Sequence, residues 1–286
     1  MLVVALLHPV DLRTAVDPLT GAVTHDPRLA ALSAPDEAAL EHALRAGDAW
    51  GARVLALSAG GPEADGALRE ARARGADIRR IALPTSHLDD LVRDEQALAR
   101  EIVVGIGERP DLVLCGDRST DRGTGALPAF LAHELGMVQA PGLVSLVLED
   151  GALLGERRLD QGRREQMRVP LPAVCSVEAA GVRLRRASLP GSLAAAEIPV
   201  EVVAGAVPPA RVRVIQARAA RPRPRQVPAP TGSARERLLA LTGALLSHEP
   251  PTVVGPVDAA DAVDALLDFL VRHGYLSEAR TGWAVQ

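Results

Sequence analysis

The sequence contains no lysine, so all 32 of its lysine-or-arginine positions are arginines. This absence excludes Schiff-base chemistry and a Walker-type phosphate clamp, because both need the lysine amine. Aromatic residues are also few: two tryptophans, two phenylalanines and one tyrosine. So low an aromatic content argues against a surface on which nucleic-acid bases or a flavin ring would stack.

Cysteines and long apolar runs are equally scarce. Cys115 and Cys175 both lie in apolar stretches typical of strands, where a small buried side chain is the expected role. No stretch approaches the roughly 20 apolar residues of a membrane helix, and the apolar N-terminus lacks the basic flank of a signal peptide. A net charge of −4 does not favour nucleic-acid or anionic-membrane partners. We therefore expect a cytoplasmic protein.

No familiar catalytic or metal-binding motif is present. The seven histidines show neither HxxxH nor HExxH spacing, and there is no GxSxG elbow. We therefore predict no catalytic residue and no metal site. His8, which follows the first apolar strand, is either an ordinary surface residue or one that faces a ligand.

What the chain does have is a regular alternation of apolar strands and helices. Residues 2–7 form a continuous apolar run, as in strands that are buried on both faces of a parallel sheet. Helices are predicted at 35–50, 62–75 and 87–108, with Ser33 as the N-cap of the first. This order predicts an α/β fold with a doubly wound, mostly parallel sheet.

Two further patterns complete the predicted organisation. A hairpin is predicted around Asp17 to Gly21, and residues 142–178 predict an antiparallel excursion with a hairpin and a return strand. We divide the chain into an α/β nucleotide-binding-type domain (1–207), a Pro/Arg-rich linker (208–232) and a C-terminal helical arm (233–286). The arm is predicted to hold two amphipathic helices, at 233–246 and 258–273.

Ligands of doubly wound sheets bind beyond the carboxyl ends of the strands, and the end at 115–125 is the richest in polar groups. Residues 112–136, LVLCGDRSTDRGTGALPAFLAHELG, predict a buried strand, a glycine-rich loop and a helix. Backbone N–H groups at a helix start attract anions, and glycines admit a phosphate. The candidate nucleotide-binding residues are Gly116, Ser119, Asp121, Gly123, Thr124 and Gly125, with Arg118 or Arg122 as the cation.

The same loop also fits a purely structural turn in which Gly123 or Thr124 caps the helix. Its glycine spacing matches neither a Walker A nor a Rossmann motif. Two interpretations of the loop therefore stay open at this point, a nucleotide-binding loop and a structural turn that holds no ligand. A hydrolase or ligase at Asp121 is disfavoured, because neither a lysine nor a metal-ligand cluster accompanies it.

Several segments in order resemble the β subunit of electron transfer flavoproteins, over about residues 1–203. They are "LVVALLHPVD" followed by "DPLTG", then "APDEAALEHALR", "LSAGGPEADGALREARARGAD", the loop and helix at 112–136, "ERRLDQG", "VPLPAVCSVE" and "RRASLP". The resemblance implies an α/β heterodimer in which the α subunit holds most of an FAD. It also implies a structural AMP in the β subunit and docking on an electron-donating dehydrogenase.

Residue by residue, the resemblance places AMP contacts at Ala5, Ser33, Ala59 and the loop at 116–125. It places a hydrophobic anchor for the donor dehydrogenase at Leu189, beside Pro190, and the alternative is that Leu189 is an ordinary loop leucine. The runner-up function is a stand-alone AMP or ATP sensor of the same fold.

This sequence departs from the family pattern at several of these positions. Leu7 and Asp117 stand where lysines are common, and Ala126-Leu127-Pro128 replaces a segment that supplies a side-chain amide. Each change removes a polar or positive contact, so retention of AMP is left open. The C-terminal segment is similar to a divergent branch of these β subunits that is associated with mycofactocin.

Overall fold

The computed structural model describes residues 1–83, 94–179, 181–206, 211–212, 215, 230–242 and 253–276. The chain divides into two units, Met1–Arg221 and Pro222–Gln286. Most of the predicted linker at 208–232 lies outside the described residues.

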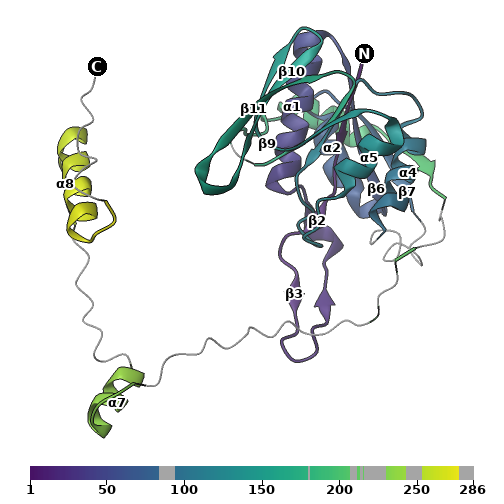
Figure 1. Cartoon of the computed structure of the whole chain (residues 1–286). Coiled ribbons are helices and arrows are strands. Elements are labelled where there is room, and N and C mark those ends of the chain that lie inside the picture. Colours follow the sequence, from purple (N-terminus) through teal and green to yellow (C-terminus); the bar gives the residue numbers. More distant parts are fainter. Residues whose placement is uncertain are drawn as a thin grey trace. The chain divides into compact units, whose positions relative to one another are not determined.

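The first unit is built on a nine-stranded sheet in the order β11-β10-β9-β12-β8-β1-β6-β7-β13 (Figure 1). The seven strands β9-β12-β8-β1-β6-β7-β13 pair in parallel with their neighbours in this order. The other two are antiparallel, because β10 pairs antiparallel with both β9 and β11. The prediction of a doubly wound, mostly parallel α/β sheet is therefore confirmed. The parallel strands are β1 (Leu2–Leu6), β6 (Arg53–Gly60), β7 (Asp77–Ala82), β8 (Leu112–Gly116), β9 (Val138–Glu149), β12 (Ala173–Val177) and β13 (Glu201–Ala204).

Helices cover both faces of this sheet. Val3 and Ala5 of β1 belong to one core cluster, together with residues of α1 (Ala34–Trp50) and α2 (Asp65–Arg72). The alternate β1 residues belong to a second cluster, with α4 (Glu95–Ile106) and α5 (Leu127–Leu135). Burial of both faces explains why the strands read as continuous apolar runs.

The predicted N-cap of the first helix is confirmed. Ser33 caps α1, and its side chain accepts from the Asp36 N–H. Asp94 caps α4 in the same way, so this helix begins at Glu95 within the predicted 87–108 segment. Residues 84–93 lie outside the described part of the chain. A short 3₁₀ turn, Pro62–Ala64, leads into α2.

Both predicted antiparallel regions are present. β9 turns into β10 (Ala152–Arg158), which pairs with β11 (Arg164–Pro170) after a 3₁₀ turn, and β12 is the return strand. The N-terminal hairpin extends away from the sheet (Figure 1). It contains β2 (Val10–Asp11), β3 (Ala15–Val16), β4 (Val23–Thr24), the 3₁₀ turn Pro27–Leu29 and β5 (Ala30–Ala31).

Two elements near the end of the first unit were not predicted. Strand β13 closes the sheet beside β7, and α6 (Leu189–Glu197) precedes it. The Ser188 side chain caps α6 by accepting from the Gly191 N–H. This short helix lacks an obvious apolar periodicity, and its packing against α2 is a tertiary effect that local sequence does not reveal.

The second unit holds two helices in its described residues, α7 (Ala234–Leu241) and α8 (Ala259–Arg272). The first helix was predicted to extend to residue 246; the described helix ends at Leu241, and Thr242 lies in a turn. Residues 243–246 lie outside the described part. Of the helices in the described residues, none has the length and apolar content needed to cross a bilayer.

The packing of α4 against the sheet can be tested by substitution of a glycine. A Cβ added at Gly105 of α4 would lie 2.3 Å from the Ile81 Cδ1 of β7, whereas one added at Gly66 of α2 would meet nothing within 4 Å. We expect Gly105→Ala to destabilise the fold by about 1–3 kcal/mol through overpacking. Gly66→Ala should be neutral or stabilising by up to about 1 kcal/mol. Denaturant unfolding measures both, and equal effects would contradict the packing described here.

Candidate functional site

The candidate site lies where the winding of the sheet reverses. β1 pairs with β6 on one side and β8 on the other, so the chain leaves these strand ends in opposite directions. The ends of three strands meet here: β1 at Leu7 and His8, β6 at Ala59 and β8 at Cys115. They line a first cavity of about 60 Å³, between β1, β8 and α4, and a second of about 270 Å³, toward the base of the hairpin.

The structure brings most of the sequence-predicted site residues together, but not all. Ala59, Gly116, Ser119, Thr124 and Gly125 line the first cavity. Asp121 lines the second, together with Ala59. Ala5 and Ser33 are buried and line neither cavity. Gly123 lies at the turn of the loop, with φ of 68°.

The polar loop at 117–125 closes on itself. The Ser119 N–H donates to the Thr124 carbonyl at 2.7 Å, and the Gly123 N–H donates to the Ser119 carbonyl at 2.8 Å. At the start of the loop, the Asp117 N–H donates to the Val177 carbonyl of β12 at 3.1 Å. These backbone donors are therefore satisfied within the protein.

Two of the loop glycines are needed for contacts within the chain. A Cβ at Gly125 would lie 2.7 Å from the Asp117 carbonyl oxygen, so this residue lets the two ends of the loop approach. A Cβ at Gly116 would lie 3.0 Å from both Pro35 and the Asp36 carboxylate, at the start of α1. Close approach of backbone to backbone or helix thus accounts for both glycines without a ligand.

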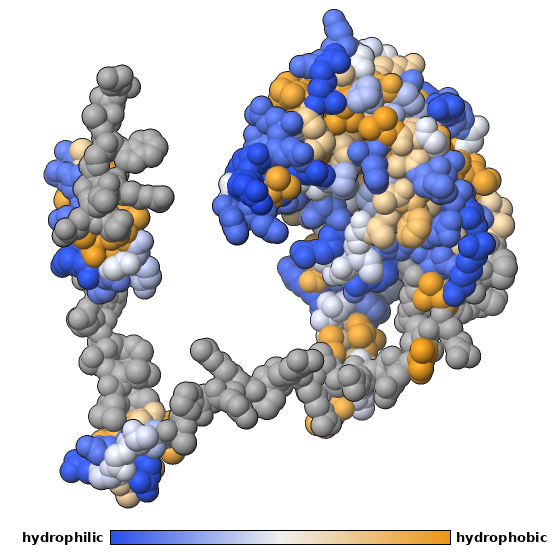
Figure 2. Space-filling view, viewed as in Figure 1, coloured by the Kyte–Doolittle hydropathy of each residue, from blue (hydrophilic) through white to orange (hydrophobic). Residues whose placement is uncertain are grey.

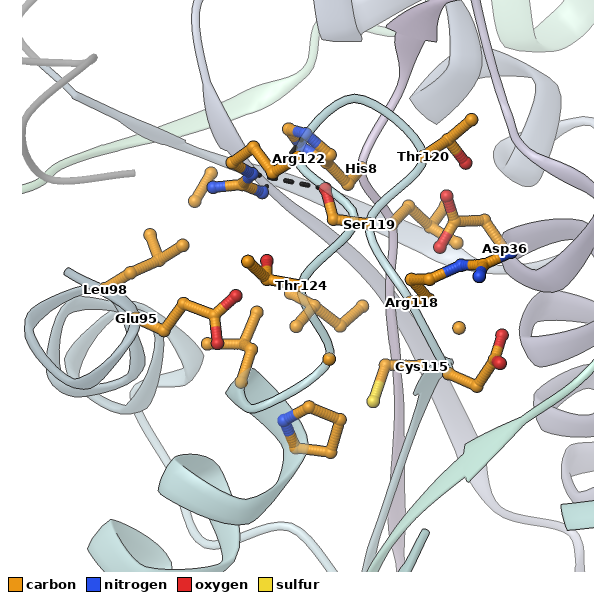
Figure 3. Close-up of a pocket in the computed structure, with 18 of the residues that line it drawn as sticks. His8, Asp36, Glu95, Leu98, Cys115, Arg118, Ser119, Thr120, Arg122 and Thr124 are labelled. Atoms are coloured by element: carbon orange, nitrogen blue, oxygen red, sulfur yellow. Dashed lines mark hydrogen bonds between the residues drawn. The ribbon is translucent and has the colours of Figure 1, made fainter. Parts of the chain in front are cut away.

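At the tip of the loop, His8, Ser119 and Arg122 lie close together (Figure 3) and form a charged cluster with Asp121. His8 Nε2 donates to Asp121 Oδ2 at 3.1 Å, and Ser119 Oγ donates to the other carboxylate oxygen. Arg122 Nε donates to Ser119 Oγ at 3.2 Å and lies 3.4 Å from Asp121 Oδ1. Burial opposes the charge of Asp121, but these hydrogen bonds and charges outweigh it and hold the pKa of Asp121 well below its usual range.

A second carboxylate reaches the start of α5. Glu95, the first residue of α4, accepts a 3.0 Å hydrogen bond from the Ala126 N–H through Oε2. Figure 3 shows Glu95 pointing from α4 toward this end of the loop. Ala126 is the N-cap residue, so the alternative that Gly123 or Thr124 caps the helix is wrong. Sequence reasoning missed Glu95, because its partner lies 31 residues away.

Asp36 is a third carboxylate at this edge and is buried. Its Oδ2 accepts a 2.8 Å hydrogen bond from the Ser33 hydroxyl. Burial raises the pKa of Asp36 to about 6, although the Ser33 hydrogen bond and nearby His8 act in the opposite direction. Burial also raises the pKa of Asp117, as does the charge of Glu178. In the described residues, no three His, Cys, Asp or Glu side chains gather as a group that would hold a metal ion.

The environment of Asp36 predicts a pH-dependent stability. A carboxyl whose pKa is raised on folding favours the folded state at acid pH, and this contribution is lost as the pH rises from 3.8 through about 6. Asn mimics the protonated form at every pH. We therefore expect Asp36→Asn to match the parent near pH 4 and to be more stable by about 2–3 kcal/mol above pH 7.

The control for this prediction is Glu37→Gln, at the exposed neighbouring position in the same helical turn. It removes a favourable charge from the helix N-terminus, so it should slightly lower the free energy of unfolding at neutral pH. Denaturant unfolding between pH 4 and 8 measures both variants. A constant difference between Asp36→Asn and the parent over this range would contradict the assignment.

The predicted docking residues lie elsewhere, at the start of α6. Leu189 is 72% exposed and Pro190 follows it in the first turn, so Leu189 begins a helix instead of lying in a loop. A Cβ at Gly191 would lie 2.8 Å from the Ala73 carbonyl, which fixes this turn against the end of α2.

An ion pair holds the chain that leads into α6. Arg185 Nε donates to buried Glu41 at 3.1 Å, and Arg185 Nη1 donates to Asp48 at 2.7 Å. Burial opposes the charge of Glu41, but hydrogen bonds from Arg185 outweigh it and lower the pKa of Glu41. The exposed leucine is therefore presented on a rigid support.

Comparisons with known proteins agree on one family. The model of the electron transfer flavoprotein domain matches residues 22–208. The electron transfer flavoprotein subunit beta of Mycobacterium tuberculosis (strain H37Rv) is 35% identical over 181 residues, which cover 61% of this chain and 66% of that protein. The protein of the same name from Syntrophomonas wolfei is 29% identical over 182 residues, covering 63% of this chain and 70% of that protein.

A third relative is Protein FixA of Rhizobium meliloti, which is 30% identical over 193 residues. The match covers 65% of each chain. The chain thus spans about two thirds of the length of these relatives, and 66% for the mycobacterial ones.

Proposed function

The chain belongs to the electron transfer flavoprotein β-subunit family, and we propose that it forms an electron-carrying heterodimer with an α subunit that holds most of an FAD. The observation that carries the proposal is the family match over residues 22–208 of the sheet-bearing unit. Flavin, when bound, accepts and passes on electrons. In this proposal the chain is a carrier subunit and not an enzyme.

The small size of the cavities supports the proposal that another subunit holds most of the flavin. The two at the sheet edge measure about 60 Å³ and about 270 Å³. Pockets for small-molecule ligands usually measure about 300–1,000 Å³, and FAD is a large ligand. Neither cavity of the described residues accommodates a flavin dinucleotide, which fits a cofactor held mainly by the α subunit.

An exposed apolar surface supports the proposal that this chain contacts a partner subunit. The hairpin that extends from the sheet exposes Val16, Leu19 and Val23, and Leu19 is 87% exposed. Figure 2 shows apolar patches along this hairpin. Apolar side chains clustered on a protruding arm are typical of interaction sites.

Leu189 and Pro190 are the proposed contact with the donor. A single exposed leucine on a rigid support suits insertion into an apolar pocket of another protein, where one well-packed side chain supplies much of the binding energy. We propose that electrons enter from a dehydrogenase docked there and leave toward the respiratory chain. The similarity of the C-terminal segment suggests a mycofactocin-linked donor, and we place the heterodimer in the cytoplasm.

Production of the chain together with its α subunit tests the heterodimer. We expect a yellow one-to-one complex with about one FAD per heterodimer, because the flavin site is completed only by the partner. Size-exclusion chromatography and absorbance near 450 nm measure this. A flavin-free complex would refute the proposal, and micromolar binding of AMP or ATP by the isolated chain would favour the sensor instead.

Leu189→Glu tests the docking contact. We expect kcat/KM for flavin reduction by the donor dehydrogenase to fall at least tenfold, because a charge would be buried in the apolar pocket. The FAD content should not change. The matched control is Val104→Glu, at an exposed position on α4 (69% exposed), which should leave both quantities unchanged. Equal loss in the two variants would remove Leu189 from the docking site.

A further inference from the structure

We propose that Glu95 and Asp121 fill the anion positions of the 117–125 loop from within the chain, so that this subunit binds no AMP. The family resemblance implies a structural AMP at this loop, and the geometry disagrees with it. This inference depends on the proposed function in one respect only, because the heterodimer is the form of the protein in which it is tested. Nucleotide content tests it separately from flavin content.

The first anion position is the N-terminus of α5. A phosphate at a helix N-terminus accepts from the free N–H groups of the first turn. Here the Ala126 N–H donates to the Glu95 carboxylate at 3.0 Å, and Pro128 has no N–H to offer. The Ala129 N–H donates to the Ala126 carbonyl at 3.0 Å. An internal carboxylate thus takes the place of the phosphate, and a second anion would meet its charge.

The second anion position is the tip of the loop. His8, Ser119 and Arg122 surround one carboxylate, that of Asp121, with contacts to both of its oxygens. These are the cation and hydroxyl donors that a phosphate would otherwise recruit. Because Asp121 already accepts from them, a phosphate would have to displace it or lie beside a like charge.

Part of the loop backbone is also engaged within the chain. The N–H groups of Asp117, Ser119 and Gly123 are bonded to protein carbonyls. Gly125 is required for close approach of the Asp117 carbonyl, and not for approach of a ligand. The cavity that the loop lines most fully measures about 60 Å³, well below the usual size of ligand pockets, about 300–1,000 Å³; the neighbouring cavity of about 270 Å³ takes only Asp121 from the loop. Contacts within the protein, and not a bound ligand, therefore account for the conformation of the loop.

Removal of the two carboxylates should open the site. Arg118 lines the first cavity and forms no salt bridge with the described residues, so the emptied site would retain a cation. The double variant Glu95→Ala/Asp121→Asn frees the Ala126 N–H and neutralises the tip. The matched control is Glu108→Gln, a carboxylate just beyond the other end of α4 that pairs with Arg53.

The experiment uses the heterodimer of this chain with its α subunit. Purified complex is denatured, and the released nucleotides are separated by chromatography and quantified. We expect fewer than about 0.1 AMP per heterodimer in the parent, with the flavin counted in the same run. Stoichiometric AMP in the parent would overturn the inference, whatever the flavin content.

The variants are then titrated with AMP by calorimetry. We expect at least tenfold tighter binding of AMP by Glu95→Ala/Asp121→Asn than by the parent or by Glu108→Gln, because two like charges are gone. No gain in affinity by a folded double variant would overturn the inference.

A second measurement uses the single variant Glu95→Ala and inorganic phosphate. Loss of the carboxylate should lower the Tm, and phosphate should restore it by occupying the start of α5. The rise in Tm with phosphate should be at least twice that of the parent and of Glu108→Gln. An equal rise in all three proteins would count against Glu95 as the internal anion.

Discussion

Burial of β1 and β8 on both faces is the constraint on which the rest of this structure depends. Two-sided burial requires helices on each face, and right-handed connections then send the chain in opposite directions from these neighbouring strands. This arrangement brings four segments to one edge of the sheet: the residues that follow β1, the residues that follow β8, the start of α1 and the start of α5. Every polar group of the candidate site reaches that edge because of this arrangement.

The electrostatics of the edge differ from those of a simple phosphate site. Three carboxylates, of Asp36, Glu95 and Asp121, are held there by different means: burial, a helix N-terminus and a cluster of donors. In a phosphate-binding loop these donors would serve a ligand. Here the Ala126 N–H and the donors around Asp121 are bonded to carboxylates of the chain itself, which is why we infer that the strand–loop–helix arrangement acts as a scaffold. On that inference, membership of the family does not require the loop to bind AMP.

The small cavities of the site and the exposed apolar side chains both agree with the proposed role of a subunit that acts together with a partner. The two cavities at the sheet edge are smaller than usual ligand pockets, and the described residues expose apolar side chains on the hairpin and on α6. The base of the hairpin is closed by the β2–β5 pairing and packs near α2 through β5, and α6 packs on α2. In the function we propose, such a subunit contributes docking surfaces while its partner holds most of the flavin.

The sequence by itself determined the α/β order, the hairpin, the antiparallel excursion and the cap of α1. These depend on local signals: apolar periodicity, turn residues and the Ser33 hydroxyl. It did not determine β13 or α6, whose positions follow from packing on β7 and α2. Nor did it show that Glu95 reaches Ala126 or that His8 reaches Asp121. Those contacts join residues 31 and 113 positions apart, and only the tertiary structure decides which distant donors and acceptors meet.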